Sequence, residues 1–473
     1  MEDQRAVIID RLKALFGGAN LTDTNSVISG SLMSNAYKQW TDLFFQDTYK
    51  SQSRFAKVLT SYMANLATTE LAINAGPSAR GEFLTAQIEA HVMPKITNIV
   101  QRAGVCGYVV LRPVVQSGGL YIDVVTPDRV VIESMDANGE IYAGAFKDYA
   151  KYKGRDVVRL EQFKYMNGEY FVHNEAHYVS GTTLSSELRM KDVPQWADIP
   201  TDYKYSGIDR PMFAVLKMPF ENTIDRVSKL PVSLYADSVD SIVGLDYILD
   251  QFMREISTGK RKQVVDRTAI KLSSDGSRSL RDAQLTGLSN KDLTTDLYIK
   301  LNMGEEQKPF DDYTPAMRMT EYRQAIDTQL RVIEMQTGFS PGTFNIDTKT
   351  GLVTATQVIS DARNTYNTIK AIQDSGLKKG LLDLVYIFDV FATVYNLAQA
   401  GEILPTVSFG DSIFEDTGTE FSRRKQLVDS GYLRAEKLVA WYFGVSDEEA
   451  AIDYMPEEKG LLDDGMVDPS AFR

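Results

Sequence analysis

The chain has 473 residues, with 51 Lys and Arg against 64 Asp and Glu, and a formal net charge of -13 at pH 7. This acidic balance excludes a protein that binds nucleic acid over its whole surface, although it is compatible with local basic patches. The single cysteine, Cys106, excludes an intramolecular disulfide framework and a cysteine-rich metal site, and we expect it to be a small buried apolar residue.

The N-terminal part of the chain has helical periodicity. Apolar residues recur at steps of three and four in LKALF, AYKQWTDLFF and RFAKVLTSYMANLATTELAI, and again in ARGEFLTAQIEAHVMPKITNIVQRAG after Gly76 and Pro77. The first residues, MEDQRAVIIDRLKALFG, are amphipathic but charged, and they lack the apolar core of a signal peptide. We therefore expect a helical opening and no export by that route.

From Gly107 to about Lys217 the hydrophobic period changes to two. Short β-branched and aromatic runs such as YVVLRPVV, RVVIESM and EYFVHNEAHYV alternate with turn sequences such as SGG, ANG and NGE. This pattern predicts a series of short strands, followed by an irregular, Pro-rich and aromatic connection over residues 192–229. Helices and strands that are segregated along the chain predict an α+β fold.

Two long helices with a strand insert between them come next. The first is predicted over about residues 230–258, with Pro231 at its start, because apolar residues recur on one face. The second is predicted from Thr314 as the N-cap, through Pro315 at the first helical position, to Gly338 as the stop. Between the helices, RKQVVDRTAIKL and TDLYIKLNM predict a small strand module.

A loop and a third long helix follow. Residues 339–354 contain Gly and Pro at positions that break any regular pattern, which predicts a loop. The third helix is predicted to start near Ala355, to run for about forty residues and to be interrupted around Gly376 and Gly380.

Part of this third helix raises the question of a membrane span. The run LLDLVYIFDVFATVYNLA is about long enough to cross a bilayer, but it contains Asp383 and Asp389. We therefore expect a helix that is buried all round within a large protein. After residue 401 the pattern predicts a short strand, small helices and an acidic tail.

A search for catalytic motifs finds none with the spacing that its chemistry needs. The sequence has no GxxxxGK[ST] phosphate loop, no HExxH and no paired cysteines. His173 and His177 are four residues apart, but their segment is a predicted strand and turn, and no third ligand has a clear spacing. We expect the adjacent carboxylates at 311–312 and 463–464 to be solvated loop residues. We therefore expect no enzyme activity, no metal and no cofactor.

The insert between the two long helices carries a local excess of positive charge. From Arg254 to Lys300 ten basic residues stand against six acidic ones, a local net charge of +4. A solvated surface of mixed charge is one interpretation. The other is a projecting module that meets a polyanion or an acidic partner, with a basic surface formed by Arg261, Lys262, Arg267, Lys271, Arg278, Arg281 and Lys291.

The order of helix, basic strand insert, helix, Gly/Pro/Thr loop and long helix, ending in DTGTEFSRRKQLVDSGYLRAEKLVAWYFGVSDEEA, resembles the portal proteins of tailed bacteriophages, in particular those of long-tailed phages of Gram-positive hosts. The segments ATTELAINAG, GYVVLRPVVQSGGLYIDVVTPDRVV, DANGEIYAGAF and RPMFAVLKMPFENTID resemble the body of the same family in the same order. The resemblance covers nearly the whole chain as a pattern of segments.

This resemblance implies a portal-type division of the chain, with a mixed α/β wing, a two-helix stem, a small α/β clip, a long wing helix and a short helical crown. The implied parts are the wing at 1–229, stem helix 1 at 230–259, the clip at 260–313, stem helix 2 at 314–338, the tunnel loop at 339–354, the long wing helix and wing strand at 355–416, and the crown at 417–473.

The resemblance also implies a function and a set of partners. Portal proteins form a ring, usually of twelve subunits, at one capsid vertex of the virion after assembly in the host cytoplasm. Double-stranded DNA passes through the ring during packaging and ejection, while terminase, the head-tail connector or adaptor, scaffold and major capsid protein dock on it. Two alternatives stay open: another virion structural protein, such as a head-tail adaptor or minor capsid protein, and a metal-dependent nucleic-acid enzyme.

The implied tunnel loop supplies the candidate DNA-contacting residues, which are Asn345, Asp347, Thr348, Lys349 and Thr350. We expect Lys349 to make a weak, salt-sensitive phosphate contact, against the alternative of an ordinary solvated lysine. Gly342 and Gly351 are the candidate hinges that let the loop move.

Overall fold

The computed structural model describes residues 30–51, 53–180, 183–259, 262–266, 298–301, 310–313, 316–344, 363–410 and 417–443. The fold mixes helices with sheets, as predicted. The chain divides into two compact units, and α12 (Thr417–Asp429) and α13 (Ala435–Phe443) belong to the second. Within that unit Phe421 and Tyr442 join the two helices, with ring centroids 5.2 Å apart.

The N-terminal helices of the first unit are α2 (Gly30–Phe45), α3 (Phe55–Thr68), α4 (Ala79–His91) and α5 (Ile96–Cys106). The 3₁₀ turn η1 (Met93–Lys95) separates α4 from α5, because Pro94 cannot continue a helix. The helical prediction was wrong for its last two residues, 72 and 73. They belong to β1 (Ala72–Asn74), which pairs with β14 (Thr406–Ser408). Cys106 is a buried free thiol, as predicted.

Antiparallel strands fill the region from residue 108 to residue 217, which confirms the predicted period of two. One sheet has the order β10-β2-β3, and the other has the order β4-β5-β6-β7-β8, with β9 also pairing with β7. The strands are β2 (Tyr108–Gln116), β3 (Gly119–Val125), β4 (Val130–Met135), β5 (Ile141–Tyr152), β6 (Arg155–Met166), β7 (Glu169–Ser180), β8 (Thr183–Leu188), β9 (Asp202–Ser206) and β10 (Ala214–Lys217).

The NGE turn sequence forms the tight hairpin between β6 and β7. Asn167 and Gly168 both have positive φ, 54° and 78°. A two-residue hairpin loop that follows the twist of its strands requires positive φ at both positions. Short 3₁₀ turns η2 (Pro127–Arg129), η3 (Met190–Asp192) and η4 (Ala236–Ser238) also occur.

The prediction of an irregular connection over residues 192–229 was wrong for β9 and β10. β9 pairs with β7, and β10 pairs with β2, so both strands extend existing sheets.

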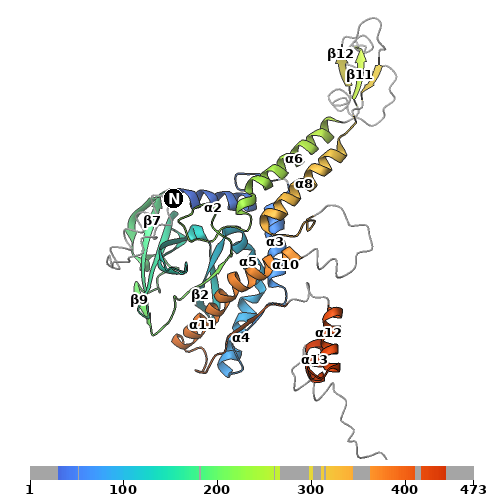
Figure 1. Ribbon diagram of the computed structural model, residues 1–473. Coiled ribbons are helices and arrows are strands. Elements are labelled where there is room, and N and C mark those ends of the chain that lie inside the picture. The colour runs from blue at the N-terminus through green and yellow to red at the C-terminus, as the bar shows by residue number, and fades with distance from the viewer. Residues whose placement is uncertain are drawn as a thin grey trace, which may run out of the picture. The chain divides into compact units, whose positions relative to one another are not determined.

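Two long antiparallel helices, α6 (Val239–Thr258) and α8 (Met319–Thr337), lie side by side (Figure 1). Between them come the insert strands β11 (Lys262–Asp266), β12 (Tyr298–Leu301) and β13 (Phe310–Tyr313). β11 pairs with β12 in parallel and with β13 antiparallel. The predicted order of helix, strand module and helix is therefore confirmed. The carboxylates at 311–312 lie in β13, so the loop that was expected there is a strand.

The first of these helices begins at Val239, eight residues after Pro231, so the predicted start was wrong. Residues 230–235 instead run without helical structure against the core, where Leu230, Val232 and Leu234 are buried. The Leu234 N–H donates to the Gly104 carbonyl at 2.9 Å. Burial of the consecutive side chains of residues 232–236 and this hydrogen bond hold the segment out of the helix, although its apolar spacing also fits a helix.

The start of α8 was also predicted too early. The helix begins at Met319, and residues 316–318 are not helical, so Pro315 is not at the first helical position. Thr314 and Pro315 themselves lie outside the described residues. Because β13 pairs with β11 up to Tyr313, the helix starts at a later residue than predicted. Gly338 ends α8 with φ 76°, as predicted.

The third long helix is interrupted where its glycines lie. It consists of α10 (Arg363–Ala371), a π-helical turn η6 (Ile372–Leu377) and α11 (Lys378–Val394), and the expected start near Ala355 lies outside the described residues. A Cβ on Gly376 would lie 2.3 Å from the Lys217 carbonyl oxygen, and one on Gly380 would lie 2.2 Å from that of Val215. Only glycine lets the helix approach β10 so closely.

Helix α11 buries one side in the core of the first unit, so the prediction of a helix buried all round was wrong for the opposite side, where Lys379 and Thr393 are exposed. Leu381, Leu384 and Phe388 are fully buried. The two carboxylates that argued against a membrane span are both paired: Asp383 with Arg210 at 2.7 Å and Asp389 with Arg80 at 2.7 Å. Among the described residues, no helix combines the length and hydropathy that a membrane crossing requires.

Candidate functional site

The structure describes the base of the candidate tunnel loop. Asn345, Asp347, Thr348, Lys349, Thr350 and Gly351 lie outside the described residues. Of the basic set, Lys262 lies in β11, and Arg261, Arg267, Lys271, Arg278, Arg281 and Lys291 lie outside. Their roles stay predictions. The site that can be built runs from the end of α8 through residues 338–344 and resumes at the start of α10.

Reciprocal hydrogen bonds join the start of the candidate tunnel loop to α10. The Ser340 N–H donates to Thr365 Oγ1 at 2.9 Å, and the Thr365 N–H donates to Ser340 Oγ at 3.1 Å. Both residues are buried. Ser340 and Thr365 therefore each accept a backbone N–H from the other. Thr368 adds a hydrogen bond from its hydroxyl to the Gly338 carbonyl at 2.7 Å.

A buried carboxylate holds the first residues of the loop. Glu334, in the last turns of α8, is 1% exposed. Its Oε2 accepts the Gly342 N–H at 2.7 Å, and its Oε1 accepts the Phe344 N–H at 2.7 Å. Gly342 has φ 87°, a left-handed conformation that favours glycine. The structure therefore places the candidate hinge Gly342 in an anchored turn, and its hinge role stays a prediction.

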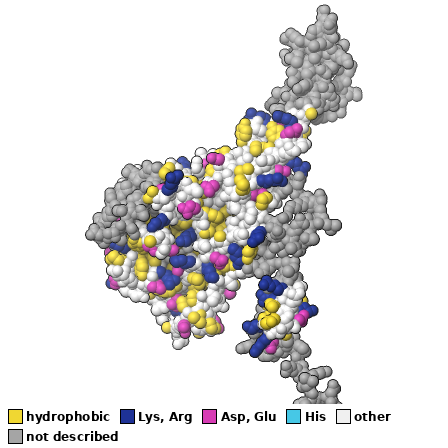
Figure 2. All heavy atoms as spheres, in the orientation of Figure 1, with side chains coloured by type: hydrophobic (Ala, Val, Ile, Leu, Met, Phe, Trp, Pro, Cys, Tyr) yellow, Lys and Arg dark blue, Asp and Glu magenta, His cyan; other side chains and the backbone are white. Residues whose placement is uncertain are grey.

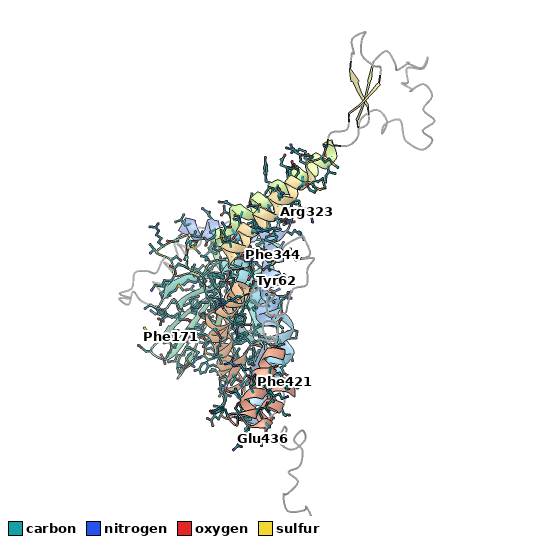
Figure 3. All side chains as sticks on the ribbon, turned by 45° about the vertical axis from the view of Figure 1, so that its right-hand side comes forward. Tyr62, Phe171, Arg323, Phe344, Phe421 and Glu436 are labelled. Carbon is teal, nitrogen blue, oxygen red and sulfur yellow. The ribbon has the colours of Figure 1, made fainter. Side chains whose placement is uncertain are left out.

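Aromatic rings attach this turn to α3. The ring centroids of Phe344 and Phe55 are 5.2 Å apart, and those of Phe344 and Tyr62 are 5.3 Å apart (Figure 3). Phe339, which is almost fully buried, lies 5.8 Å from the Tyr62 ring. Partial burial raises the pKa of Tyr62. Polar and apolar contacts together give the loop a defined starting point.

At the opposite end of the α6/α8 pair, next to the insert strands, Glu255 and Arg318 form an ion pair between the two helices. The Glu255 carboxylate accepts the backbone N–H of Arg318 at 3.0 Å and also pairs with its guanidinium. These hydrogen bonds from Arg318 lower the pKa of Glu255 to about 2. Phe252 and Tyr322 lie one turn further along, with centroids 5.5 Å apart.

The middle of the pair is closely packed. Gln329 Nε2 donates to the Ser241 carbonyl at 2.8 Å. A Cβ on Gly244 would lie 3.1 Å from Gln329 Nε2, so the glycine admits this side chain between the helices. The two helices are thus joined at three levels, from the loop base to the insert strands.

The described residues offer little for metal chemistry. Among the described residues, no three His, Cys, Asp or Glu side chains lie close enough together to hold a metal ion. His173 and His177 lie on β7, as the strand pattern predicts. His173 Nδ1 lies 2.7 Å from Asp202 Oδ1 on the neighbouring strand.

The family model described as phage portal protein, SPP1 Gp6-like, matches residues 55–461 of the chain. The chain belongs to this portal protein family. The match extends from α3 beyond α13 and includes both long helices, the insert and the loop. The prediction of a phage portal protein is therefore confirmed.

Other comparisons are more distant. No curated protein matches the chain. One similar solved chain comes from the neck of an empty GTA particle computed with C6 symmetry, with 10% sequence identity, a TM-score of 0.40, and coverage of 92% of this chain and 98% of that chain. The family match, and not this likeness, identifies the portal protein.

Sequence reasoning missed the residues that hold the start of the candidate tunnel loop, which are Glu334, Ser340 and Thr365. A signal existed for Glu334, because it continues the apolar stripe of Ile326, Leu330 and Ile333, where a carboxylate has to find buried partners. Ser340 and Thr365 carried no comparable signal, since 25 residues separate them and neither interrupts a periodic pattern.

Proposed function

We propose that this portal protein closes into a ring around an axial channel for double-stranded DNA, with residues 339–354 as the tunnel loop that faces the channel. The observation that carries the proposal is the antiparallel α6/α8 pair, in which the end of α8 is hydrogen-bonded to the start of the loop, within a segment that the portal family matches. Ser340 at this start is also hydrogen-bonded to Thr365 of α10. A helix pair fixed in this way can hold a loop at a constant place in each subunit.

The same proposal assigns the remaining parts. Residues 230–259 and 314–338 are the stem helices, and residues 260–313 are the clip. Residues 1–229 and 355–416 are the wing, and 417–473 are a short crown. The strand content of residues 108–217 and the helices α12 and α13 are in keeping with these assignments.

Charge supports passage of DNA without tight binding. A chain with a net charge of -13 repels phosphate over most of its surface, and a few basic side chains can guide the duplex through weak, salt-sensitive contacts. Lys349 is the proposed contact on the loop, with Asn345, Asp347, Thr348 and Thr350 beside it, and Gly342 and Gly351 as the hinges.

The proposed partners follow from the ring and from the basic insert. We place the ring, of twelve subunits, at a capsid vertex of the virion, assembled in the host cytoplasm, where scaffold and major capsid protein surround it. The basic clip surface is the docking site for terminase during packaging and for the head-tail connector afterwards. The portal is a conduit without an enzymatic step of its own, and a separate motor hydrolyses ATP.

Electron microscopy and native mass spectrometry of the purified full chain test the ring. We expect closed rings with a central hole and a mass that is an integral multiple of 52.9 kDa. Protein that stays strictly monomeric at high concentration would contradict the proposal.

Substitution of Lys349 tests the loop. Lys349→Ala is expected to form rings as the unaltered chain does but to package or retain less DNA, because a phosphate contact is lost. Lys151→Ala, on an exposed part of β5, is the matched control and should leave packaging unchanged. If Lys349→Ala packages DNA normally, this lysine has no part in the mechanism.

A further inference from the structure

Helix α6 has a face that touches neither α8 nor the core. Its contacts with α8 come from Ser241, Gly244, Phe252 and Glu255. A different face, the α6 face, carries Asp240, Val243, Tyr247 and Asp250 at steps of three, four and three residues. Tyr247 is 65% exposed and Val243 is 37% exposed. Two apolar side chains one turn apart are thus left in solvent.

Helix α8 has a matching free face on the side away from α6. Tyr322 and Gln329 face α6. The α8 face consists of Gln324, Thr328, Arg331 and Met335, at steps of four, three and four residues. Met335 is 73% exposed. Figure 2 shows apolar side chains among charged ones on the visible side of this helix pair.

The two faces carry free charges of opposite sign. Asp240 on the α6 face and Arg331 on the α8 face are both exposed, and neither has an ion-pair or hydrogen-bond partner among the described residues. Elsewhere on the helix pair, Glu255 and Arg318 neutralise each other within the subunit. The faces are therefore complementary to each other and unsatisfied within one chain.

The two charges also lie at the same height along the pair. Gly244 lies level with Gln329, and Phe252 lies level with Tyr322. In the antiparallel pair, these contacts put Asp240 level with residue 333 or 334, which is about 3–4.5 Å from Arg331 along the helix direction at 1.5 Å per residue. Tyr247 and Thr328 are level within a similar distance.

We propose that the α8 face of one subunit packs against the α6 face of the next copy, with Arg331 paired to Asp240 of that copy. This inference rests on the proposed ring. Rotation about an axis parallel to the helices brings residues of equal height together and joins two different faces, which is the heterologous contact that closes a ring. Tyr, Met and Arg are side chains that subunit interfaces favour at their centres.

Charge reversal with rescue tests the pairing. Asp240→Arg alone and Arg331→Asp alone are each expected to raise the subunit concentration needed for ring assembly at least about tenfold, because each places like charges opposite one another at every junction. The double variant restores attraction and is expected to assemble close to the level of the unaltered chain. Asp156→Arg, at an exposed position near a hairpin tip, is the control and should assemble normally.

These assemblies are measured by mass photometry across a salt series, with circular dichroism to verify folding. If both single reversals assemble like the unaltered chain, the pairing is wrong while the ring stands. If the unaltered chain forms no rings, the proposed function fails first, so the two failures are distinguishable.

Thiol cross-linking tests the packing without altering charge. The double variant Tyr247→Cys, Thr328→Cys is treated with a short bismaleimide, and Cys106 is buried and does not compete. Because the two positions lie on opposite faces of one subunit, a ladder of covalent multimers on a denaturing gel supports the contact between copies. Each single variant should stay monomeric. Rings that yield no ladder from the double variant overturn the inference.

Discussion

Helix α11 and the outer half of the α6/α8 pair differ in where their stability comes from. On α11, Leu381, Leu384 and Phe388 are fully buried, and every such contact is made within the chain. In residues 249–257 and 319–325, no described side chain is buried. The first region is a core element that the subunit completes alone. The second is joined by an ion pair, one aromatic contact and, by our inference, a neighbouring copy.

Charges follow the same division. In the sheets, Arg112 lies between Asp148 at 2.9 Å and Glu161 at 3.2 Å, and Arg159 also pairs with Asp148. Burial alone would raise the pKa of Asp148, but the two arginines lower it to about 2. On the helix pair Asp240 and Arg331 have no such partners among the described residues. Buried charges must be satisfied inside the chain, and exposed ones are available for assembly.

The largest expected effect comes from α11. Phe388→Ala should lower the free energy of unfolding by about 3–5 kcal/mol, because it opens a cavity in a filled core. Urea unfolding, at concentrations below those of assembly, measures the loss. Tyr247→Ala on the α6 face is the contrast and should change it by no more than about 0.5 kcal/mol. Equal losses would erase the distinction between the two regions.

The arginine network should come next. Asp148→Asn is expected to lower the free energy of unfolding by about 2–3 kcal/mol at pH 7, because it removes the carboxylate that Arg112 and Arg159 share and leaves Glu161 as the counter-charge that contacts both of them. The depressed pKa of Asp148 means that its stabilisation is present above the unfolded pKa of about 3.9 and is lost as pH falls toward about 2. The difference between variant and unaltered protein should therefore shrink over that interval. A difference that is independent of pH would contradict this account.

An intermediate effect is expected at the loop base. Glu334→Gln keeps the shape but has one acceptor oxygen for the two N–H groups of Gly342 and Phe344, and it should cost about 1–3 kcal/mol. Hydrogen exchange at these two amides should speed up more than exchange in α11. Glu321→Gln, at an exposed position on α8, is the control. If exchange at the loop base is unchanged, the carboxylate does not anchor the loop.

The smallest effect is expected at the outer end of the pair. Glu255→Gln should speed hydrogen exchange over residues 316–322 with little change elsewhere, because the contact with Arg318 is exposed and local. The pKa of Glu255 is depressed to about 2, so the contact holds above about pH 4.5 and weakens as pH falls toward 2. The variant and the unaltered chain should therefore differ at pH 7 and converge near pH 2.

Much of the architecture could be predicted because it depends on the spacing of apolar and turn residues that are near one another in the sequence. The period of two over residues 107–217, the strand insert between long helices and the stop at Gly338 are properties of neighbouring residues, and the structure confirms them. The order of segments also identified the portal family. The tunnel-loop and clip residues were named from resemblance, and they stay predictions because nearly all of them lie outside the described residues.

Only the tertiary structure decided what lies beyond periodicity. Apolar spacing continues from Leu230 into α6, but burial in the core and the hydrogen bond to Gly104 in α5 keep residues 230–235 out of the helix. Ser340 and Thr365 meet across 25 residues of chain. Side-chain spacing reports which face of a helix or strand is apolar, because that depends on local geometry. Which groups meet there depends on how distant segments are brought together, and no local pattern contains that information.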